Sequence, residues 1–456
     1  MKRLILASLM ALMVSGCATE VEKAPTSLPI PDSWRQQVGP SAAPEAQWWQ
    51  RFGDDNLNRL VNQALQHNSD ILIARSRVDQ YRAQLRAAQG DNFPTLSAGV
   101  AATHQRALSA VTGQPYENAV FQGLLQANYD VDLWGSRSNN ILASQASLDA
   151  QRAAASAAEL TVASSVASGY LSLCALDEQL RVTEATLATR ENSLNLAQRQ
   201  FETGYTSRLE WMQAASEYQT AKAQVPQLQH QIEQQENALS VLVGMNPREI
   251  ARTRNFDHIK PQTLPTLLPS QLLNRRPDIV QAQRQLIAAD ASLASAQADL
   301  LPSLNLTATG TLQSYQLHQL LDNPFRLWSI GGSILAPLLN REALTAQVDV
   351  AMATRNQALY GYEKVVRGAF SDVDNALDAI RRSQEQLTEL QKQEGYVTEA
   401  FRIARNRYQN GYASYLDELD AQRTLFSTQL NIVSVKNTLL LAQIDLYRSL
   451  GGGWQG

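Results

Sequence analysis

The amino-terminal region contains a cysteine placed where covalent lipidation would occur. Lys2 and Arg3 precede an apolar run from Leu4 to Val14, and small residues follow, which is the layout of a secretory signal peptide. The run is too short to span a bilayer as a helix. The last residues, Val14 to Cys17, have the form of a bacterial lipobox, in which the cysteine is acylated and becomes the new amino terminus.

We therefore expect a signal peptide over residues 1–16 and a covalent lipid such as palmitate on Cys17. Ala18 stands where an aspartate would retain such a lipoprotein at the inner membrane, and its presence favours the outer membrane. The alternative is an ordinary signal peptide with an incidental cysteine. Beyond this leader we expect no helix apolar enough to cross a membrane, so any crossing would be made by β-strands.

Residue types that could support catalysis are present but are not arranged for it. The histidines at positions 67, 104, 230, 258 and 318 lack ligand spacing, and Cys174 lies among apolar residues as a small buried side chain would. The stretch from Gly451 to Gly456 matches a dinucleotide-binding pattern, but it follows a helix and does not open one. The net charge of −4, without a basic cluster, argues against nucleic acid. We expect no enzyme activity, no metal site and no cofactor other than the lipid.

The chain repeats itself. Asp70 and Pro94 are 24 residues apart, and so are Asp278 and Pro302 in the second half. Two glycine-containing segments, Phe201–Ser207 and Tyr408–Ser414, are related by an offset of 207 residues, against 208 for the two aspartates. Such constant spacing indicates two copies of one structural unit.

Each copy should contain one very long helix. No proline occurs between Pro115 and Pro226 or after Pro337, and both stretches are rich in good helix formers. Residues 136–203 and 341–410 would each form a helix of about 100 Å at ~1.5 Å per residue. Shorter helices over roughly 54–90 and 208–243 could lie beside them, with Pro226 producing a kink or an irregular turn.

The segments between the helices alternate polar and apolar residues with a period of two. Strands are expected at about 95–104, 120–132, 303–313 and 326–337, each with one apolar and one polar face. This pattern fits a transmembrane barrel, but four strands are too few to close one, since the smallest have about eight. Exposed sheet edges are not tolerated in lipid, so other copies of the chain must complete the barrel.

These observations define the expected organisation. An extended, lipid-anchored segment over 17–53 precedes repeat 1 at 54–244, a proline-containing linker at 245–269 and repeat 2 at 270–456. The long helices end in tip turns at 204–207 and 411–414.

In this arrangement the residues resemble the TolC-like outer-membrane factors, and in particular the NodT-type lipoproteins of RND efflux systems. The resemblance is carried by Trp48–Asp54, Asn68–Ile71, Arg275–Ile279, Leu301–Leu304 and Leu450–Trp454. It implies an α+β membrane protein, a homotrimer whose twelve-stranded barrel is continued by a periplasmic coiled-coil barrel. It also implies a periplasmic adaptor and a proton-driven inner-membrane RND-type transporter as partners, and expulsion of drugs or metal ions through a passive gated duct.

The resemblance also assigns a gate. Asp417 and Asp420 match the carboxylates that line the constriction, Tyr408 matches the gate tyrosine, and Glu210 stands where the partner of that tyrosine would be. Ala413 replaces an arginine that helps to latch the closed state in the best-known type, so the latch of this chain must differ.

The tip turns would dock the adaptor, through six residues: Gly204, Tyr205, Ser207, Gly411, Tyr412 and Ser414. Two other functions stay open, namely the duct of a type I protein-secretion exporter and a non-conducting coiled-coil lipoprotein scaffold. The residues identify neither the cargo nor the transporter.

Overall fold

The computed structural model describes residues 28–36, 45–253, 256–259, 268–322 and 326–454. They belong to two compact units: a sheet-bearing unit of residues 77–152 and 281–363, and a helical unit of residues 29–76, 153–280 and 364–456. The expected signal peptide and the lipidation site Cys17 lie outside the described residues.

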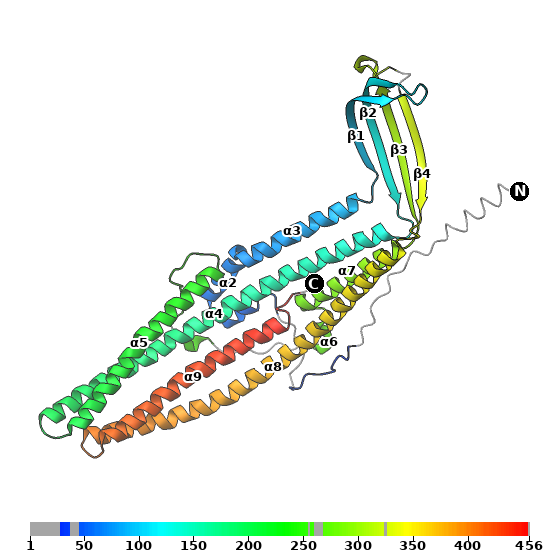
Figure 1. Cartoon of the computed structure of the whole chain (residues 1–456). Helices are drawn as coiled ribbons and strands as arrows, with labels where there is room; N and C mark the ends of the chain where they lie inside the picture. The colour runs from blue at the N-terminus through cyan, green and yellow to red at the C-terminus, as the bar shows by residue number, and fades with distance from the viewer. Residues whose placement is uncertain (1–27, 37–44, 254–255, 260–267, 323–325, 455–456) are drawn as a thin grey trace. The chain divides into compact units, whose positions relative to one another are not determined.

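The sheet-bearing unit contains four antiparallel strands in chain order, β1 (Thr95–Leu108), β2 (Pro115–Val131), β3 (Ser303–Ser314) and β4 (Arg326–Leu335) (Figure 1). The first hairpin is longer than expected, because pairing continues to Leu108 and Pro115 and a short turn closes it. Strand β4 is shorter than expected and ends before Pro337, which has no N–H group to donate to a ladder.

The register gives the sheet two different faces. Asn128 lies opposite Thr307 and Asp130 opposite Asn305, and the Asn305 side chain donates a hydrogen bond to Asp130. On the other face most side chains are apolar, although Arg106 and Glu117 pair near the β1–β2 turn, and Trp328 and Ile330 of β4 are each 78% exposed in the single chain. One face therefore suits water and the other suits an apolar environment.

The α-helices are α2 (Asp55–His67), α3 (Ser69–Gly90), α4 (Ser136–Glu202), α5 (Arg208–Leu242), α6 (Pro269–Leu272), α7 (Pro277–Ala298), α8 (Arg341–Gln409) and α9 (Tyr415–Ser449). Short 3-10 helices are η1 (Trp48–Phe52), η2 (Phe256–His258) and η3 (Leu317–Gln319). In the helical unit, α4 with α5 and α8 with α9 form two hairpins (Figure 1).

Of the expectations about the helices, two were wrong and one was narrowed. The helix expected over 54–90 is divided at Asn68, whose backbone is extended because its side chain caps the start of α3. Helix α5 is continuous through Pro226, so of the kink or irregular turn expected there the irregular turn is absent. A window of α4 is long and apolar enough to cross a membrane by composition, but 56% of it is buried inside the structure, as in a core helix.

The C-terminal ends of α5 and α9 are held in the same way. Gly244 and Gly451 both have positive φ and close Schellman turns. A Cβ atom on either would collide with backbone carbonyl oxygens, of His67 and of Arg275 respectively. The neighbouring side chains add matching bonds: Asn68 Nδ2 donates to Leu242 O at 2.9 Å, and Arg276 Nη1 donates to Ser449 O at 3.3 Å.

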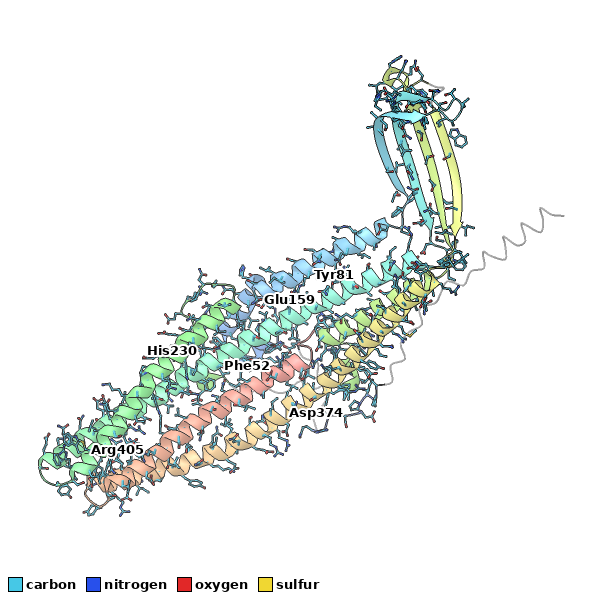
Figure 2. The ribbon with its side chains drawn as sticks, viewed as in Figure 1. Phe52, Tyr81, Glu159, His230, Asp374 and Arg405 are labelled. Carbon is cyan, nitrogen blue, oxygen red and sulfur yellow. The ribbon has the colours of Figure 1, made fainter. Side chains whose placement is uncertain are left out.

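The amino-terminal segment of the described chain packs on α8. Trp34 lies edge-on to Phe370, with ring centroids 6.1 Å apart. The backbone N–H of Arg35 donates to Asp374, labelled on α8 in Figure 2. This part of the expected extended segment is thus fixed to the helical unit.

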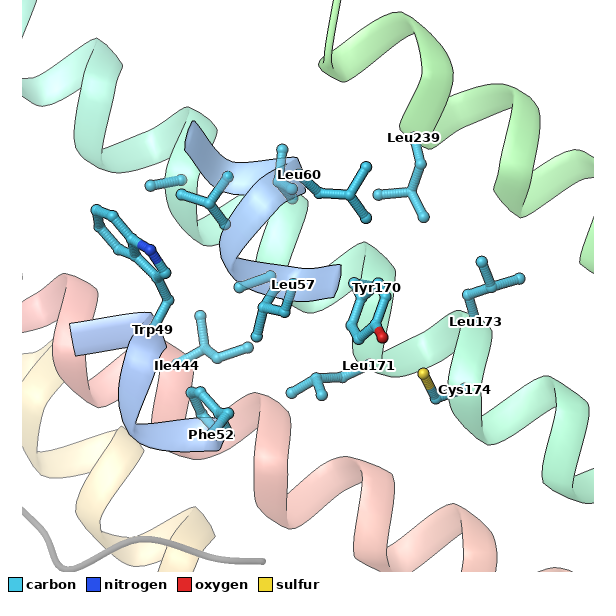
Figure 3. Close-up of a cluster of buried hydrophobic side chains, with 14 of the residues drawn as sticks. Trp49, Phe52, Leu57, Leu60, Tyr170, Leu171, Leu173, Cys174, Leu239 and Ile444 are labelled. Carbon is cyan, nitrogen blue, oxygen red and sulfur yellow. The ribbon is translucent and has the colours of Figure 1, made fainter. Parts of the chain in front are cut away.

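A large apolar core joins the ends of the helices in the helical unit. Trp48 is fully buried and stacks on Tyr447 at 5.2 Å between centroids. Figure 3 shows Phe52 and Leu57 facing Leu171 of α4 and Ile444 of α9. The residues from η1 and α2 therefore bind both hairpins into one body.

We expect Gly451→Ala to destabilise the protein by about 2 kcal/mol or more, because the alanine would be strained at positive φ and would collide with Arg275 O. Thermal unfolding in detergent, followed by circular dichroism, would measure this. Gly395→Ala is the matched control, since Gly395 lies in α8 with open space around it and alanine favours helix. Equal melting temperatures for the two variants would contradict the prediction.

Candidate functional site

The two hairpin turns end the long helices with the same backbone motif. Gly204 has φ +74° and Gly411 has φ +77°. Tyr205 N donates to Gln200 O, and Tyr412 N donates to Arg407 O, both at 2.8 Å, as in a Schellman motif. A Cβ on Gly411 would touch the hydroxyl of Tyr205, so the two turns lie side by side (Figure 1).

The residues expected to dock an adaptor occupy this paired tip. Tyr205 and Tyr412 are 68% and 77% exposed. Ser207 accepts a hydrogen bond from Glu210 N at the start of α5, and Ser414 begins α9 in a capping box. The serines thus have a structural role as helix caps, whereas the tyrosines are available to a partner.

Tyr408 lies inside the tip. It is 3% exposed, packs against Tyr415 at 5.5 Å between centroids, and donates its hydroxyl to Gln200 Oε1 at 2.9 Å. This hydrogen bond takes the place of the expected pairing with Glu210. Burial raises the pKa of Tyr408 well above its usual value, with a smaller contribution from the charge of Glu210. Tyr408 therefore links α8 to α4 as a neutral group.

The two candidate constriction carboxylates are both exposed in the single chain. Asp417 Oδ2 accepts hydrogen bonds from Ser414 N at 3.1 Å and Ser414 Oγ at 3.0 Å, so this carboxylate completes the helix cap. Asp420 lies one turn further along α9, and its charge acts on Arg423. The two carboxylates thus stand in the first two turns of α9, where the helix N-terminus favours negative charge.

A third acid, Glu418, points into the structure. It is 2% exposed, and one oxygen accepts a hydrogen bond from Ser193 Oγ of α4 at 3.1 Å. Its Oε2 atom is buried and has no hydrogen-bond partner among the described residues. Burial raises the pKa of Glu418, against weaker opposing effects of Ser193 and of Arg405, which Figure 2 labels near the tip. The neutral carboxylic acid is therefore the form that suits this position.

A cluster of charged side chains, further from the tip than Glu418, connects the two helical hairpins. Arg190 of α4 is 4% exposed and contacts Glu217 of α5, both at Oε2 (3.2 Å) and at the backbone carbonyl oxygen (2.9 Å). Arg423 of α9 contacts the other carboxylate oxygen of Glu217. The Arg190 guanidinium also lies over the ring of Phe426 at 5.5 Å.

The sequence reasoning missed Arg190, Glu217 and Glu418, although a signal was present. Glu418 shares its helix face with buried Tyr415, three residues before it, and buried Gln422, four residues after it. Heptad spacing therefore places it in the contact between helices.

Within the described residues, no cluster of three or more His, Cys, Asp or Glu side chains could hold a metal ion. The tip instead offers exposed carboxylates, paired aromatic side chains and a charge-paired interior. The exposed carboxylates Asp417 and Asp420 give this arrangement a negative charge that can attract cations.

Replacing Glu418 with glutamine should change how stability depends on pH. A raised pKa in the folded state means that protonation stabilises the fold: this contribution is complete below the unfolded pKa of about 4.3 and is lost as pH rises through the folded pKa. Glutamine stays neutral at every pH. The melting temperature of Glu418→Gln should therefore be higher than that of the parent, and the difference between them should grow from pH 4 to pH 8.

Glu399→Gln provides the control for this measurement. Glu399 is exposed on α8, and its hydrogen bond with Arg402 lowers its pKa, so its replacement should give no gain at high pH. A Glu418→Gln variant whose advantage stays constant or shrinks from pH 4 to pH 8 would refute the assignment of a neutral Glu418.

Comparison with known proteins is consistent with this geometry. The chain is 33% identical over 466 residues to the pyoverdine export outer membrane protein OpmQ of Pseudomonas aeruginosa, covering 100% of this chain and 98% of that protein. It is 30% identical over 452 residues to the cation efflux system protein CusC of Escherichia coli O6:H1, covering 98% and 97% respectively. The crystal structure of CusC superimposes with a TM-score of 0.86 at 28% identity, covering 96% of this chain and all of that one.

The family model described as outer membrane efflux protein matches residues 60–245 and 268–452, which is most of the chain. The two matched segments correspond to the two hairpin-containing halves. The relatives are outer-membrane transport proteins, not enzymes. The chain therefore belongs to the outer membrane efflux protein family and is an efflux channel protein of the outer membrane.

Proposed function

We propose that three copies of this chain form a gated duct, which receives cargo from an inner-membrane RND-type transporter through a periplasmic adaptor. The observation that carries this proposal is the sheet. Among the described residues, β1 pairs only with β2 and β4 pairs only with β3, so both edges are open. Open edges are not stable in lipid, and three copies would close a barrel of twelve strands.

The two halves of the chain would each contribute one hairpin of strands and one hairpin of helices to this duct. Their equivalence is supported by Gly244 and Gly451, which end α5 and α9 against matching backbone carbonyls. It is supported also by Asn68 and Arg276, which bond the same helix ends. A trimer of such chains would have six similar helical hairpins around its axis.

The polar face of the sheet would then line the barrel, and the apolar face would contact lipid. Trp328 and Ile330 lie on the apolar face, and in the membrane their side chains would contact lipid instead of water. Acylation of Cys17, which metabolic labelling with palmitate would detect, would hold the amino terminus at the same membrane. No other cofactor is proposed.

The cargo would be small compounds, organic molecules or metal ions. OpmQ is named for pyoverdine export and CusC for cation efflux, and this chain is about equally similar to both. Because a passive duct need not coordinate what passes through it, the transporter rather than the duct would select the cargo. The tip tyrosines Tyr205 and Tyr412, both exposed, would contact the adaptor.

The gate would lie at the tip, with Asp417 and Asp420 at its narrowest point. Six carboxylates in a trimer would raise the local cation concentration and favour cation passage. Asn is the suitable replacement, because its side-chain oxygen can still accept the cap bonds that Asp417 makes to Ser414.

In planar bilayers, the purified full-length protein should form cation-selective pores, and Asp417→Asn with Asp420→Asn should lower both the cation selectivity and the block by multivalent cations. Asp445→Asn, near the other end of α9, is the control and should behave as the parent. If the double variant forms pores with the same cation selectivity as the parent, the assignment of Asp417 and Asp420 to the gate is wrong. If the parent protein forms no pores, the non-conducting scaffold is favoured.

A strain that lacks the gene should become more sensitive to some drugs or metal ions, and the gene supplied in trans should restore resistance. The susceptibility profile would identify the cargo class. Unchanged susceptibility, together with loss of one secreted protein and co-purification with a different inner-membrane partner, would instead identify a type I exporter duct.

A further inference from the structure

The apolar face of the sheet carries charged side chains at one end only. Side chains alternate between the two faces along each strand, and the pairing places Arg106, Glu117 and Arg326 on the apolar face. Among the four described strands they are the only Asp, Glu, Lys or Arg residues on that face. All three lie near the hairpin turns, opposite the end where α3, α4, α7 and α8 join the strands (Figure 1).

The apolar stretch between this end and the helix end has the length of a membrane core. Leu96 and Arg106, on the same face of β1, are ten residues apart, which is about 33 Å along a strand at ~3.3 Å per residue. With a strand tilt of about 40°, this becomes about 25 Å across the membrane, the height of the apolar band of an outer-membrane barrel. At the helix end the same face is apolar, with Leu304 opposite Ile334. The arginines therefore mark one boundary of the band.

This boundary faces the outer leaflet of the membrane. In the proposed duct the long helices lie in the periplasm, so the hairpin turns of the sheet lie at the outer surface. The outer leaflet of a bacterial outer membrane is made of glycolipid that carries phosphate groups. Arginine suits such groups, because its planar fork binds phosphate oxygens in pairs. The charges on the sheet are thus complementary to phosphorylated lipid in both sign and depth.

Both arginines can reach a ligand. The side chain of Arg106 is 70% exposed, and its ion pair joins Nε to Glu117 Oε1 at 3.7 Å, which is too long for a hydrogen bond. Arg326 is exposed, and its Nη2 donates to Leu321 O at 3.5 Å. These contacts use one of the five donors of each guanidinium. Trp328, two residues from Arg326 on the same face, is 78% exposed, and indole rings favour the depth of lipid headgroups.

The trimer would bring the two arginines to neighbouring strands. Arg106 lies on β1 and Arg326 on β4, which are the two open edges of the sheet. Closing the barrel would place β4 of one subunit antiparallel to β1 of the next, with both arginines near the turn end and on the lipid face. Each seam between subunits would then carry a pair of arginines on adjacent strands, which a single chain does not have.

We propose that each seam binds a phosphate group of an outer-leaflet glycolipid, through Arg326 of one subunit and Arg106 of the partner subunit. The acyl chains of the lipid lie along the apolar face, beside Trp328 and Ile330. Glu117 competes with the phosphate group for Arg106. The proposal rests on the proposed function, because the seam exists only in the trimer. Free phosphate lacks acyl chains and gains nothing from the apolar face, so the occupant is a membrane lipid.

Native mass spectrometry of the purified full-length protein, titrated with bisphosphorylated lipid A or with its dephosphorylated form, tests the proposal. The parent should bind the phosphorylated lipid more tightly. Arg106→Gln with Arg326→Gln should weaken this binding about 25-fold, at about fivefold for each basic residue near an anionic lipid surface, and should leave binding of the dephosphorylated lipid unchanged. Glu117→Gln should strengthen it, because Arg106 loses its competing carboxylate. Arg402→Gln is the matched control, since Arg402 pairs with Glu399 on the surface of α8.

The same spectra report assembly and lipid binding separately. A parent trimer that binds both forms of lipid A equally, or a double variant that keeps the preference of the parent, would overturn the lipid site. Displacement of the lipid by an equal concentration of inorganic phosphate would also overturn it, because the site would then be one for free phosphate. A parent protein that remains a monomer would refute the proposed trimer and the seam with it.

Discussion

The two helical hairpins of this chain meet along a narrow seam in which buried residues recur every three or four positions. On α4 the buried residues near the tip include Thr186, Arg190, Ser193 and Ala197, so the seam is largely polar there. Helices of 67 and 69 residues cannot be stabilised over such a length by intrinsic propensity alone, and they depend on this contact. Polar groups in the seam need partners from the facing helix, which fixes the register of one hairpin on the other. The same requirement makes the contact easier to loosen than an apolar one would be.

The helical unit therefore differs along its length. Around Trp48 and Tyr447 the core is large and apolar, and it includes residues from η1, α2, α4, α5 and α9. At the tip the apolar cluster is small, with the two tyrosines Tyr408 and Tyr415 at its centre, and hydrogen bonds and ion pairs provide much of the remaining contact. Local opening is favoured where few apolar contacts hold a region. The helical unit is thus held by many apolar contacts around Trp48 and by few at the tip.

Much of this fold could be predicted from the sequence because its signals are local and repeated. Alternation with a period of two located the strands, and the absence of proline located α4 and α8. Other features depended on contacts that no local pattern describes. Asn68 divides the first short helix because its side chain can cap α3 while bonding α5, and Pro226 is accommodated within α5. For the candidate site, resemblance identified Asp417 and Asp420, but the buried acid Glu418 between them required the helix face to be considered.

The difference between the two tip turns now has a physical meaning. The first hairpin supplies acceptors that stay in place, Gln200 to Tyr408 and Glu217 to Arg423. The second hairpin supplies the donors of these contacts, together with the exposed carboxylates Asp417 and Asp420. Both contacts join the second hairpin to the first, and the buried Arg190 holds the Glu217 carboxylate within the first hairpin. Duplication provided two hairpins with the same backbone turn, and the copies differ in the charged and polar side chains that they place at the tip.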